Sequence, residues 1–412
     1  MKPHSSQDAE GAMDHSLAPV PEDLAWLAPS SNDELVDLLR RLKVAGSSAC
    51  VRGGGCSTNG RSVAELRQIR MHRFDGIRID GQTLICGGGT TLQTVARALR
   101  ANGHWLPVLP SSPTATVGGV LAAGGFGPAS LRHGGLYAAL REVSLATPSL
   151  GVVRVCRDKD PEGVFSLIPG SLGGLGPIVE ARLALMRVAP PLLSTERVDS
   201  RPLQQIAEEL IDGPAEAATL VSADLQGWRV LTYASRTTPG GGKTDLHADL
   251  HEREQAFQRS EASWIEAVGL KPGRARRIWV DFLVPLRRIG ELQNAFVQEA
   301  SFPGSFQVYH AMVFDERATA SAAGFPFLPL AGKGPVVSLG TYVTFSDTSG
   351  GEFIDRIEYL RALTHAIGGR QYLHGPHPQQ HSFYLEQFGR PALDRFAALR
   401  RSFGLDALLP GF

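Results

Sequence analysis

The sequence predicts an α+β protein whose second half contains an antiparallel sheet. The first half carries three glycine-rich stretches, which lie between short apolar runs typical of buried strands. Beyond about residue 190 the glycine clusters end, apart from a turn at residues 239–242. Longer alternating runs there predict strands at residues 277–284, 307–314 and 336–345. Amphipathic stretches predict helices at residues 203–211, 246–268 and 351–367.

The other elements follow from local signals taken in chain order. A helix is expected at residues 35–42, because Ser31 and Asn32 are good N-cap residues. A second helix is expected at residues 92–102, with Gly103 as its stop. Apolar runs predict strands at residues 49–51, 83–86 and 178–186, a hairpin at residues 142–147 and 152–156, and a last, helical stretch at residues 383–412.

The glycine-rich stretches predict a phosphate site. The first follows a predicted strand and contains Arg52, Gly53, Gly54, Gly55, Cys56, Ser57, Thr58, Asn59 and Gly60. Glycine leaves backbone N–H groups bare, so such a loop can surround a phosphate, and the arginine adds positive charge. A second stretch, at residues 116–127, lies about sixty residues further on. Together they predict one long pyrophosphate cofactor held from two sides. Neither fits the P-loop pattern, and neither is expected to open a helix as a dinucleotide fingerprint does.

Composition limits the class of protein. The 412 residues include 41 Lys and Arg and 41 Asp and Glu, so the net charge is zero. This balance argues against a dedicated nucleic-acid binder or a basic membrane-surface protein. No apolar run approaches the ~18–20 residues that cross a bilayer. The four cysteines include no C-x-x-C pair, which favours reduced thiols and a cytoplasmic location. Residues 1–19 are polar and are expected to form a disordered tail rather than a signal peptide.

The motifs resemble those of the vanillyl alcohol oxidase/p-cresol methylhydroxylase superfamily of FAD enzymes, and within it the cytokinin dehydrogenase branch. That branch carries R-G-x-G-H-S where this chain has residues 52–57, and T-V-G-G-T-L-S-N-A-G-x-x-G-x-x-x-R-H-G where it has residues 116–127 followed by 131–134. Its G-G-L-G-x-x-G-I-I, W-x-N-L-F-V-P, K-Q-Y-L-P and D-P-x-x-I-L-x-P-G elements are similar to residues 170–179, 279–285, 370–373 and 406–411. Because the motifs occur in the same order, the resemblance runs from about residue 20 to the C-terminus.

The resemblance implies a two-lobed fold that binds FAD. An FAD-binding domain would cover residues 20–190, a substrate domain residues 191–365, and a C-terminal segment at residues 366–412 would return to the FAD domain. Three glycine stretches argue against a binding protein that has lost its cofactor. The implied cofactor-binding residues are Arg52, Gly53, Gly54, Gly55, Cys56, Ser57, Gly60, Thr116, Gly118, Gly119, Ala122, Gly124, Gly127, Gly174, Gly176, Ile178 and Val179.

The implied activity is that of an FAD-dependent oxidoreductase. It would take hydride from a C–H next to N or O, or from an activated ring position, of a small organic and secondary-metabolite substrate. Dioxygen or another electron acceptor would then reoxidise the flavin. The alternative is a natural-product cyclase in which FAD is structural. No nucleic-acid or membrane partner is expected.

Two positions depart from the family pattern. Cys56 stands where members with covalent flavin have a histidine, and the second attachment point falls at Ser112. A Cys56 thiolate could bond the flavin, or the residue is a small buried thiol beside a noncovalent flavin. Ser111 stands where the branch has its proton-accepting aspartate. A serine without a partner base accepts protons poorly, so either the base comes from the substrate domain or the substrate is already acidic.

The candidate catalytic residues are therefore sought in the second half: Asp281, Tyr372, Tyr342 and His310. Alternation places Trp279 and Asp281 on one strand face, and Tyr309 and His310 on opposite faces. Asp281 is either a base or anchor in the cavity, or a structural partner of the basic residues 274–277. The tyrosines and His310 could equally be core residues with satisfied polar atoms. His374, His377 and His381 lack helical spacing and a carboxylate partner, so no metal is expected.

Overall fold

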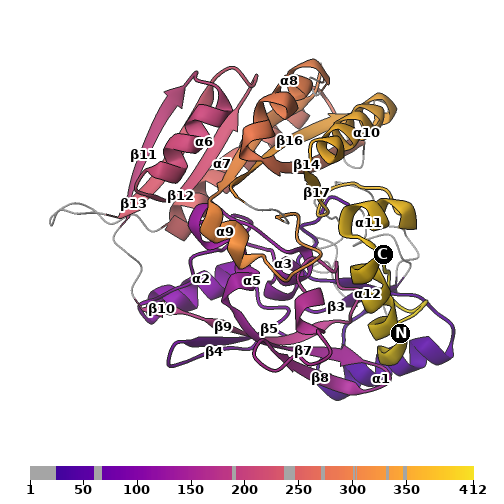
Figure 1. The fold of residues 1–412 in the computed structure, drawn as a ribbon. Helices are drawn as coiled ribbons and strands as arrows, with labels where there is room; N and C mark the ends of the chain where they lie inside the picture. The colour runs from indigo at the N-terminus through magenta and orange to yellow at the C-terminus, as the bar shows by residue number, and fades with distance from the viewer. Residues whose placement is uncertain are drawn as a thin grey trace.

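The computed structural model describes residues 25–59, 67–187, 192–235, 246–270, 274–299, 302, 304–330, 334–346 and 350–412. The tail expected at residues 1–19 lies outside them. The described residues form helices together with four sheets, two of which contain five and seven antiparallel strands (Figure 1). The α+β class predicted from the sequence is confirmed.

The glycine-rich half is built on the five-stranded sheet, whose strand order is β4-β5-β9-β7-β8. A parallel sheet β1-β3-β2 and a pair β10-β6 accompany it. The predicted hairpin is β7 and β8, and helix α1 is capped by the Ser31 hydroxyl, which accepts from Glu34 N. The elements are β1 (Ala25–Leu27), α1 (Asn32–Val44), β2 (Cys50–Arg52), β3 (Arg67–Arg70), β4 (Ile77–Asp80), β5 (Thr83–Gly87), α2 (Leu92–Ala101), β6 (His104–Trp105), α3 (Val117–Ala123), α4 (Ser130–His133), α5 (Leu136–Ala139), β7 (Leu140–Thr147), β8 (Gly151–Cys156), a 3₁₀ turn (Phe165–Leu167), β9 (Ile178–Ala184) and β10 (Met186–Arg187).

The second half is built on the seven-stranded sheet, whose order is β11-β13-β12-β15-β16-β14-β17. The three predicted strands are β14, β15 and β16, and the three predicted helices are α6, α7 and α10. Strands β11, β12 and β13 were not predicted. The elements are β11 (Leu192–Asp199), α6 (Leu203–Asp212), β12 (Ala215–Ser222), β13 (Trp228–Ser235), α7 (Leu246–Ala267), β14 (Ala275–Pro285), a 3₁₀ turn (Leu286–Arg288), α8 (Ile289–Glu299), β15 (Phe306–Phe314), α9 (Glu316–Ser321), β16 (Val336–Ser346), α10 (Gly350–Ala366), β17 (Arg370–Tyr372), α11 (His381–Phe388) and α12 (Arg390–Phe403).

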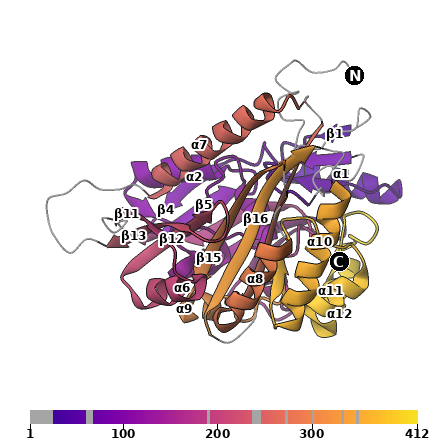
Figure 2. The same ribbon diagram turned by 90° about the horizontal axis from the view of Figure 1, so that it is seen from above.

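The two faces of the seven-stranded sheet have different neighbours because side chains alternate along each strand. Val280, Phe282 and Val337 join an apolar cluster with residues of α6, α8 and α10, such as Phe296 and Phe353. Helix α7 lies on the other side of the sheet from α8 and α10 (Figure 2). The opposite face carries both apolar and polar side chains, among them Trp279, Asp281 and His310.

The C-terminal residues join both halves. Strand β17 forms the edge of the seven-stranded sheet by pairing with β14. Helices α11 and α12 pack in the same apolar cluster as the five-stranded sheet, through residues such as Tyr384 and Phe396. The buried Arg400 guanidinium donates to the carbonyls of Gly174 at 2.6 Å and Leu409 at 2.5 Å. This ties the end of the chain to the third glycine stretch, at residues 170–176.

Candidate functional site

A cavity of about 980 Å³ lies between the glycine stretches and the face of the seven-stranded sheet that carries Trp279, Asp281 and His310. Its size is at the upper end of the usual range for small-molecule sites, about 300–1,000 Å³. Residues of the first glycine stretch, α3 and the third glycine stretch line one wall. Residues of β12, α7, β14, β15 and β16 line the other. The cavity is thus shared by the two halves of the chain.

The first glycine stretch presents free backbone donors to this cavity. Within the described part of the chain, the N–H groups of residues 53–57 donate no hydrogen bond, and all five residues line the cavity. Gly55 has φ +68°, which a side chain rarely adopts. A Cβ on Gly54 would lie 2.0 Å from the Thr114 carbonyl oxygen, and one on Gly53 would lie 2.3 Å from Thr116 Oγ1. Glycine therefore lets the first two stretches touch while their amides stay available to an anion.

The sequence predicts that the second glycine stretch is a loop that does not open a helix. This prediction is wrong, because residues of the stretch form helix α3. Thr116 caps this helix by accepting from Gly119 N at 3.3 Å. Gly118 N donates to Gly88 O at 2.8 Å, and a Cβ at position 118 would lie 2.8 Å from that oxygen. The glycines of α3 thus serve close packing against Gly88 as well as access to the cavity.

The predicted cofactor residues separate into two groups. Twelve line the cavity: Gly53, Gly54, Gly55, Cys56, Ser57, Thr116, Gly118, Gly119, Ala122, Gly127, Gly176 and Ile178. Four lie behind its wall: Arg52, Gly124, Gly174 and Val179. Gly60 lies outside the described residues.

The residues behind the wall have structural contacts that explain their positions. Arg52 is buried, and its guanidinium stacks 5.7 Å from the centroid of the Trp26 ring. Gly124 ends α3 in the left-handed conformation, beside Leu328. Gly174 packs against Phe396 of α12. In the described structure, these residues support the wall from outside the cavity.

Cys56 and Ser112, at the two family attachment points, are neighbours. Cys56 Sγ lies 3.4 Å from both Ser112 Oγ and Thr114 Oγ1. Burial raises the pKa of the Cys56 thiol, while these hydroxyls and the Arg52 charge oppose the shift without cancelling it. A thiol with a raised pKa is a weak nucleophile at neutral pH. The geometry therefore favours the noncovalent interpretation of Cys56.

Asp281 and His310 form the centre of the opposite wall. His310 Nε2 lies 2.6 Å from Asp281 Oδ1, and Ser338 Oγ donates to the same oxygen at 3.1 Å. Burial acts to raise the pKa of Asp281, but the charges of His310 and His374 and the two hydrogen bonds outweigh it and lower the pKa. The basic residues 274–277 do not pair with Asp281, since Arg277 pairs with Glu261. Of the two interpretations of Asp281, the structural ion pair with the basic run is therefore wrong.

His310 is the member of this pair that is open to the cavity. Its side chain is 17% exposed, whereas that of Asp281 is 1% exposed. The Trp279 indole nitrogen also lies 2.9 Å from His310 Nε2. Nε2 cannot accept from the indole while it donates to Asp281, so in the tautomer that donates to Asp281 the indole is only a close neighbour. In that tautomer Nδ1 carries the lone pair, and within the described residues Nδ1 makes no hydrogen bond. His374 completes the wall, with Nε2 3.8 Å from Asp281 Oδ2. Tyr309, on the other strand face, lies in the apolar cluster.

The two tyrosine candidates have different surroundings. The Tyr342 ring lines the cavity, but its hydroxyl donates to the buried Glu261 carboxylate at 3.1 Å. The Tyr372 side chain also lines the cavity and lies over His374, with ring centroids 4.3 Å apart. Burial, followed by the charge of Asp281, raises the pKa of Tyr372. Both phenols are therefore neutral at physiological pH, and Tyr342 is already engaged.

Glu254 is a cavity residue that the sequence analysis did not single out. Ser111, at the position of the family aspartate, donates from Oγ to Glu254 Oε2 at 3.3 Å. Both residues line the cavity, Glu254 from helix α7. Many charged residues surround Glu254 in the sequence of this helix, so the sequence predicts an ordinary solvent-exposed glutamate. The one available signal was Ser111, which stands at the position of the family aspartate and so indicated that another carboxylate could be needed nearby.

The described ranges contain neither a metal-binding group nor a membrane-spanning helix. Among these residues, His, Cys, Asp and Glu side chains form no group of three or more that could hold a metal ion. None of the described helices combines the length and apolarity of a membrane span.

The sequence is similar to an FAD binding domain and to several dehydrogenases and oxidases. Residues 24–157 match the family of the FAD binding domain. Cytokinin dehydrogenase 7 of Oryza sativa subsp. japonica is 29% identical over 258 residues, 59% of this chain and 48% of that protein. Alditol oxidase of a Streptomyces species is 30% identical over 162 residues, 38% of this chain and 37% of that protein. D-lactate dehydrogenase of Archaeoglobus fulgidus is 27% identical over 173 residues, 40% and 39% of the two chains.

The chain spans less than half the length of these curated relatives. Within the matched part, the glycine stretch at residues 52–57 supplies the free amides of the cavity wall, and the stretch at residues 116–127 lines the cavity beside it. FAD is the cofactor of this family, and five consecutive free amides suit its diphosphate. The chain therefore carries an FAD-binding domain over residues 24–157 and is similar to enzymes such as cytokinin dehydrogenase and alditol oxidase.

Proposed function

We propose that the protein is an FAD-dependent oxidoreductase that oxidises a small organic molecule in the cavity between the glycine stretches and the seven-stranded sheet. Residues 20–190 with the C-terminal segment at residues 366–412 would hold FAD, and residues 191–365 would cover the substrate. The substrate would lose hydride from a C–H next to N or O, or from an activated ring position. Dioxygen or another acceptor would complete the cycle.

One observation carries this proposal: a single cavity joins free backbone amides on one wall to a buried Asp–His pair on the other. The amides of residues 53–57 would bind the diphosphate of FAD. Bound FAD would supply the two-electron acceptor for the hydride. Because one end of the cavity is suited to the cofactor and the opposite wall carries a base, a substrate between them would meet both.

His310 is the residue we assign as the proton acceptor. When hydride leaves carbon, the neighbouring N–H or O–H must lose a proton, and Nδ1 of His310, a cavity-lining residue, would receive it. Asp281 orients the ring through Nε2 and stabilises the imidazolium that forms. Tyr372 and Trp279 would shape the cavity and exclude water. A base supplied by the second half of the chain would remove the need for an aspartate at Ser111.

The proposal is tested by anaerobic reduction of the FAD-loaded protein. Amines, alcohols and phenols are screened for loss of the visible absorbance of oxidised flavin. The proposal expects one class to bleach the flavin, and expects oxygen or an added acceptor to restore the colour. Conversion of a substrate to an isomeric cyclised product without bleaching would favour the cyclase alternative instead.

A further inference from the structure

Most charges on the cavity wall are already balanced by protein partners. Arg253 lies 3.1 Å from both Glu196 and Asp249, and Arg229 lies 3.3 Å from Glu196. Asp281 is paired with His310 at 2.6 Å. These groups therefore add little net charge at the surface that meets a ligand.

Glu254 differs from these groups. It lines the cavity, and in the described part of the chain it forms no ion pair. Its two oxygens accept only from neutral donors, Ser111 Oγ at 3.3 Å and Gln258 Nε2 at 3.0 Å. Hydrogen bonds fix the direction of the carboxylate without neutralising it. A negative charge held in a partly enclosed cavity favours a positively charged ligand group.

An aromatic surface continues from this carboxylate. Phe257 lies one helical turn after Glu254 on α7 and shares its face. The Phe257 ring meets the edge of Tyr342 with centroids 4.7 Å apart, and Tyr342 lies 5.9 Å from Trp279. All four side chains line the cavity. Aromatic faces attract cations through their quadrupole. The Arg277 guanidinium already lies over the Tyr342 ring, 5.4 Å from its centroid, so the Phe257 ring is the one that reinforces the preference set by the carboxylate.

We propose that Glu254, Ser111, Phe257 and Tyr342, here called the Glu254 subsite, bind a cationic group of the substrate such as a protonated amine. The ammonium would donate to Glu254 and rest on the Phe257 ring, with Tyr342 beside it, while the remainder of the substrate extends toward His310. Glu254 is then a specificity-determining residue that selects by charge. This inference rests on the proposed function in one respect: the substrate must occupy the same cavity.

The test compares three probes that share one ring and differ in charge: benzylamine, benzyl alcohol and benzoate. Their binding to the FAD-loaded protein is measured at pH 7 by perturbation of flavin absorbance, and by calorimetry. We expect the wild type to bind benzylamine more tightly than benzyl alcohol and benzoate. Glu254→Gln should weaken the binding of benzylamine at least tenfold, because hydrogen bonds to a charged group are stronger than those between neutral groups. The same substitution should change the affinity for benzyl alcohol less than threefold.

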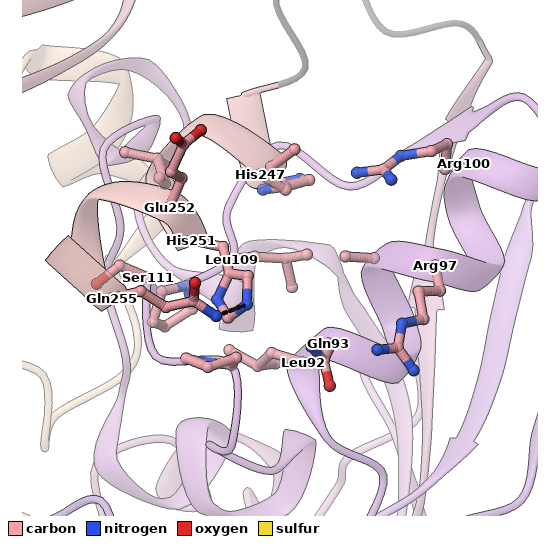
Figure 3. A pocket seen from close by; sticks show the side chains of 15 residues that line it. Leu92, Gln93, Arg97, Arg100, Leu109, Ser111, His247, His251, Glu252 and Gln255 are labelled. Carbon is pink, nitrogen blue, oxygen red and sulfur yellow. Dashed lines mark hydrogen bonds between the residues drawn. The ribbon is translucent and has the colours of Figure 1, made fainter. Parts of the chain in front are cut away.

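Two variants control for indirect effects. Glu252 lies two residues before Glu254 on α7 and lines an adjoining pocket of about 210 Å³ together with Gln255 and with Ser111, which also lines the main cavity (Figure 3). Glu252→Gln removes the same charge from the same helix and should leave benzylamine binding within threefold. Glu254→Asp keeps the charge and should keep the preference for benzylamine over benzyl alcohol. Circular dichroism and FAD content confirm that each variant is folded.

The outcomes separate this inference from the proposed function. It is overturned if the wild type fails to bind benzylamine, if benzoate binds as tightly, or if Glu254→Gln retains full affinity for benzylamine. If benzylamine binding depends on Glu254 but no compound bleaches the flavin, the subsite stands and the oxidoreductase proposal fails. If the substrate is oxidised but its binding does not depend on Glu254, the oxidoreductase proposal stands and the subsite fails.

Discussion

The Nε2 atom of His310 on β15 lies 2.6 Å from Oδ1 of Asp281 on β14. Strand β16 lies between these two strands in the sheet. This contact passes over Gly340 of β16, where a Cβ would lie 2.4 Å from Asp281 Oδ1 and 2.6 Å from His310 Nε2. A glycine in the middle strand is therefore what allows two side chains from non-adjacent strands to meet. The pair exists because three strands are in one register.

His310→Gln tests the assigned proton acceptor. We expect the rate constant of flavin reduction to fall by about 10²-fold or more, because general-base catalysis typically contributes about 10²–10⁴. The rate is measured by anaerobic stopped-flow absorbance with the substrate found in the screen. His365→Gln is the matched control, since His365 is half exposed on α10 and pairs with Glu386. A variant that reduces flavin within threefold of the wild type would remove His310 from the mechanism.

Gly340→Ala tests whether the central glycine is needed for the pair. The added methyl group would collide with the Val280 carbonyl oxygen as well as with Asp281 and His310. We expect the free energy of unfolding to fall by roughly 1–3 kcal/mol, as is usual for an added group in a packed core. Urea unfolding measures it, and Gly290→Ala, where a Cβ meets nothing within 4 Å, is the control. Equal stabilities of the two variants would contradict this account of the contact.

The stability contributed by Asp281 should depend on pH. Its folded pKa is lowered, so its stabilisation is present above the unfolded pKa of about 3.9 and is lost as the pH falls through the folded value. Asp281→Asn should therefore cost roughly 1–3 kcal/mol at neutral pH, and the difference from the wild type should shrink below about pH 4. Urea unfolding at a series of pH values measures both. A difference that stays constant or grows on acidification would mean that the folded pKa is not lowered.

The noncovalent interpretation of Cys56 has a direct consequence. Because burial raises the pKa of the thiol, we expect acid precipitation of the holoprotein to release yellow FAD into the supernatant. Cys56→Ser should bind FAD in the same amount. A yellow pellet from the wild type and a colourless pellet from Cys56→Ser would establish a thioether bond to the flavin.

The amide-lined wall should be sensitive to a single methyl group. Gly54→Ala would place Cβ against the Thr114 carbonyl oxygen, so the first glycine stretch must move away from the second. We expect the Kd for FAD to rise at least tenfold, which corresponds to about 1.4 kcal/mol. Quenching of flavin fluorescence measures it in apoprotein refolded with FAD. Gly76→Ala, at another open position, should bind FAD like the wild type.

Short-range patterns predicted the parts of the fold that depend on local periodicity. The alternation in residues 277–284 and 307–314 placed Trp279 and Asp281 on one face and Tyr309 opposite His310, and the structure has this arrangement. The glycine content alone marked the wall that faces the cavity. Strand alternation repeats every two residues, and the glycine stretches depend on one residue type. Both can therefore be recognised in one amino-acid sequence.

The features that were missed depend on contacts between distant segments. Helix α3 forms in spite of two adjacent glycines because Thr116 caps it and Gly88 accepts from Gly118 N. Strands β11 and β12 place apolar residues such as Val198 and Val221 on the exposed side, so their sequences do not alternate with burial. Glu254 becomes a cavity residue only through Ser111, which is 143 residues away in the sequence. Periodicity within a segment does not encode such pairings.

A crystal structure of the FAD complex tests the central claim most directly. The account predicts diphosphate oxygens within about 2.7–3.2 Å of main-chain nitrogens of residues 53–57, with the flavin ring facing the wall that holds His310 and Asp281. A diphosphate bound elsewhere, with these amides still facing water, would contradict it.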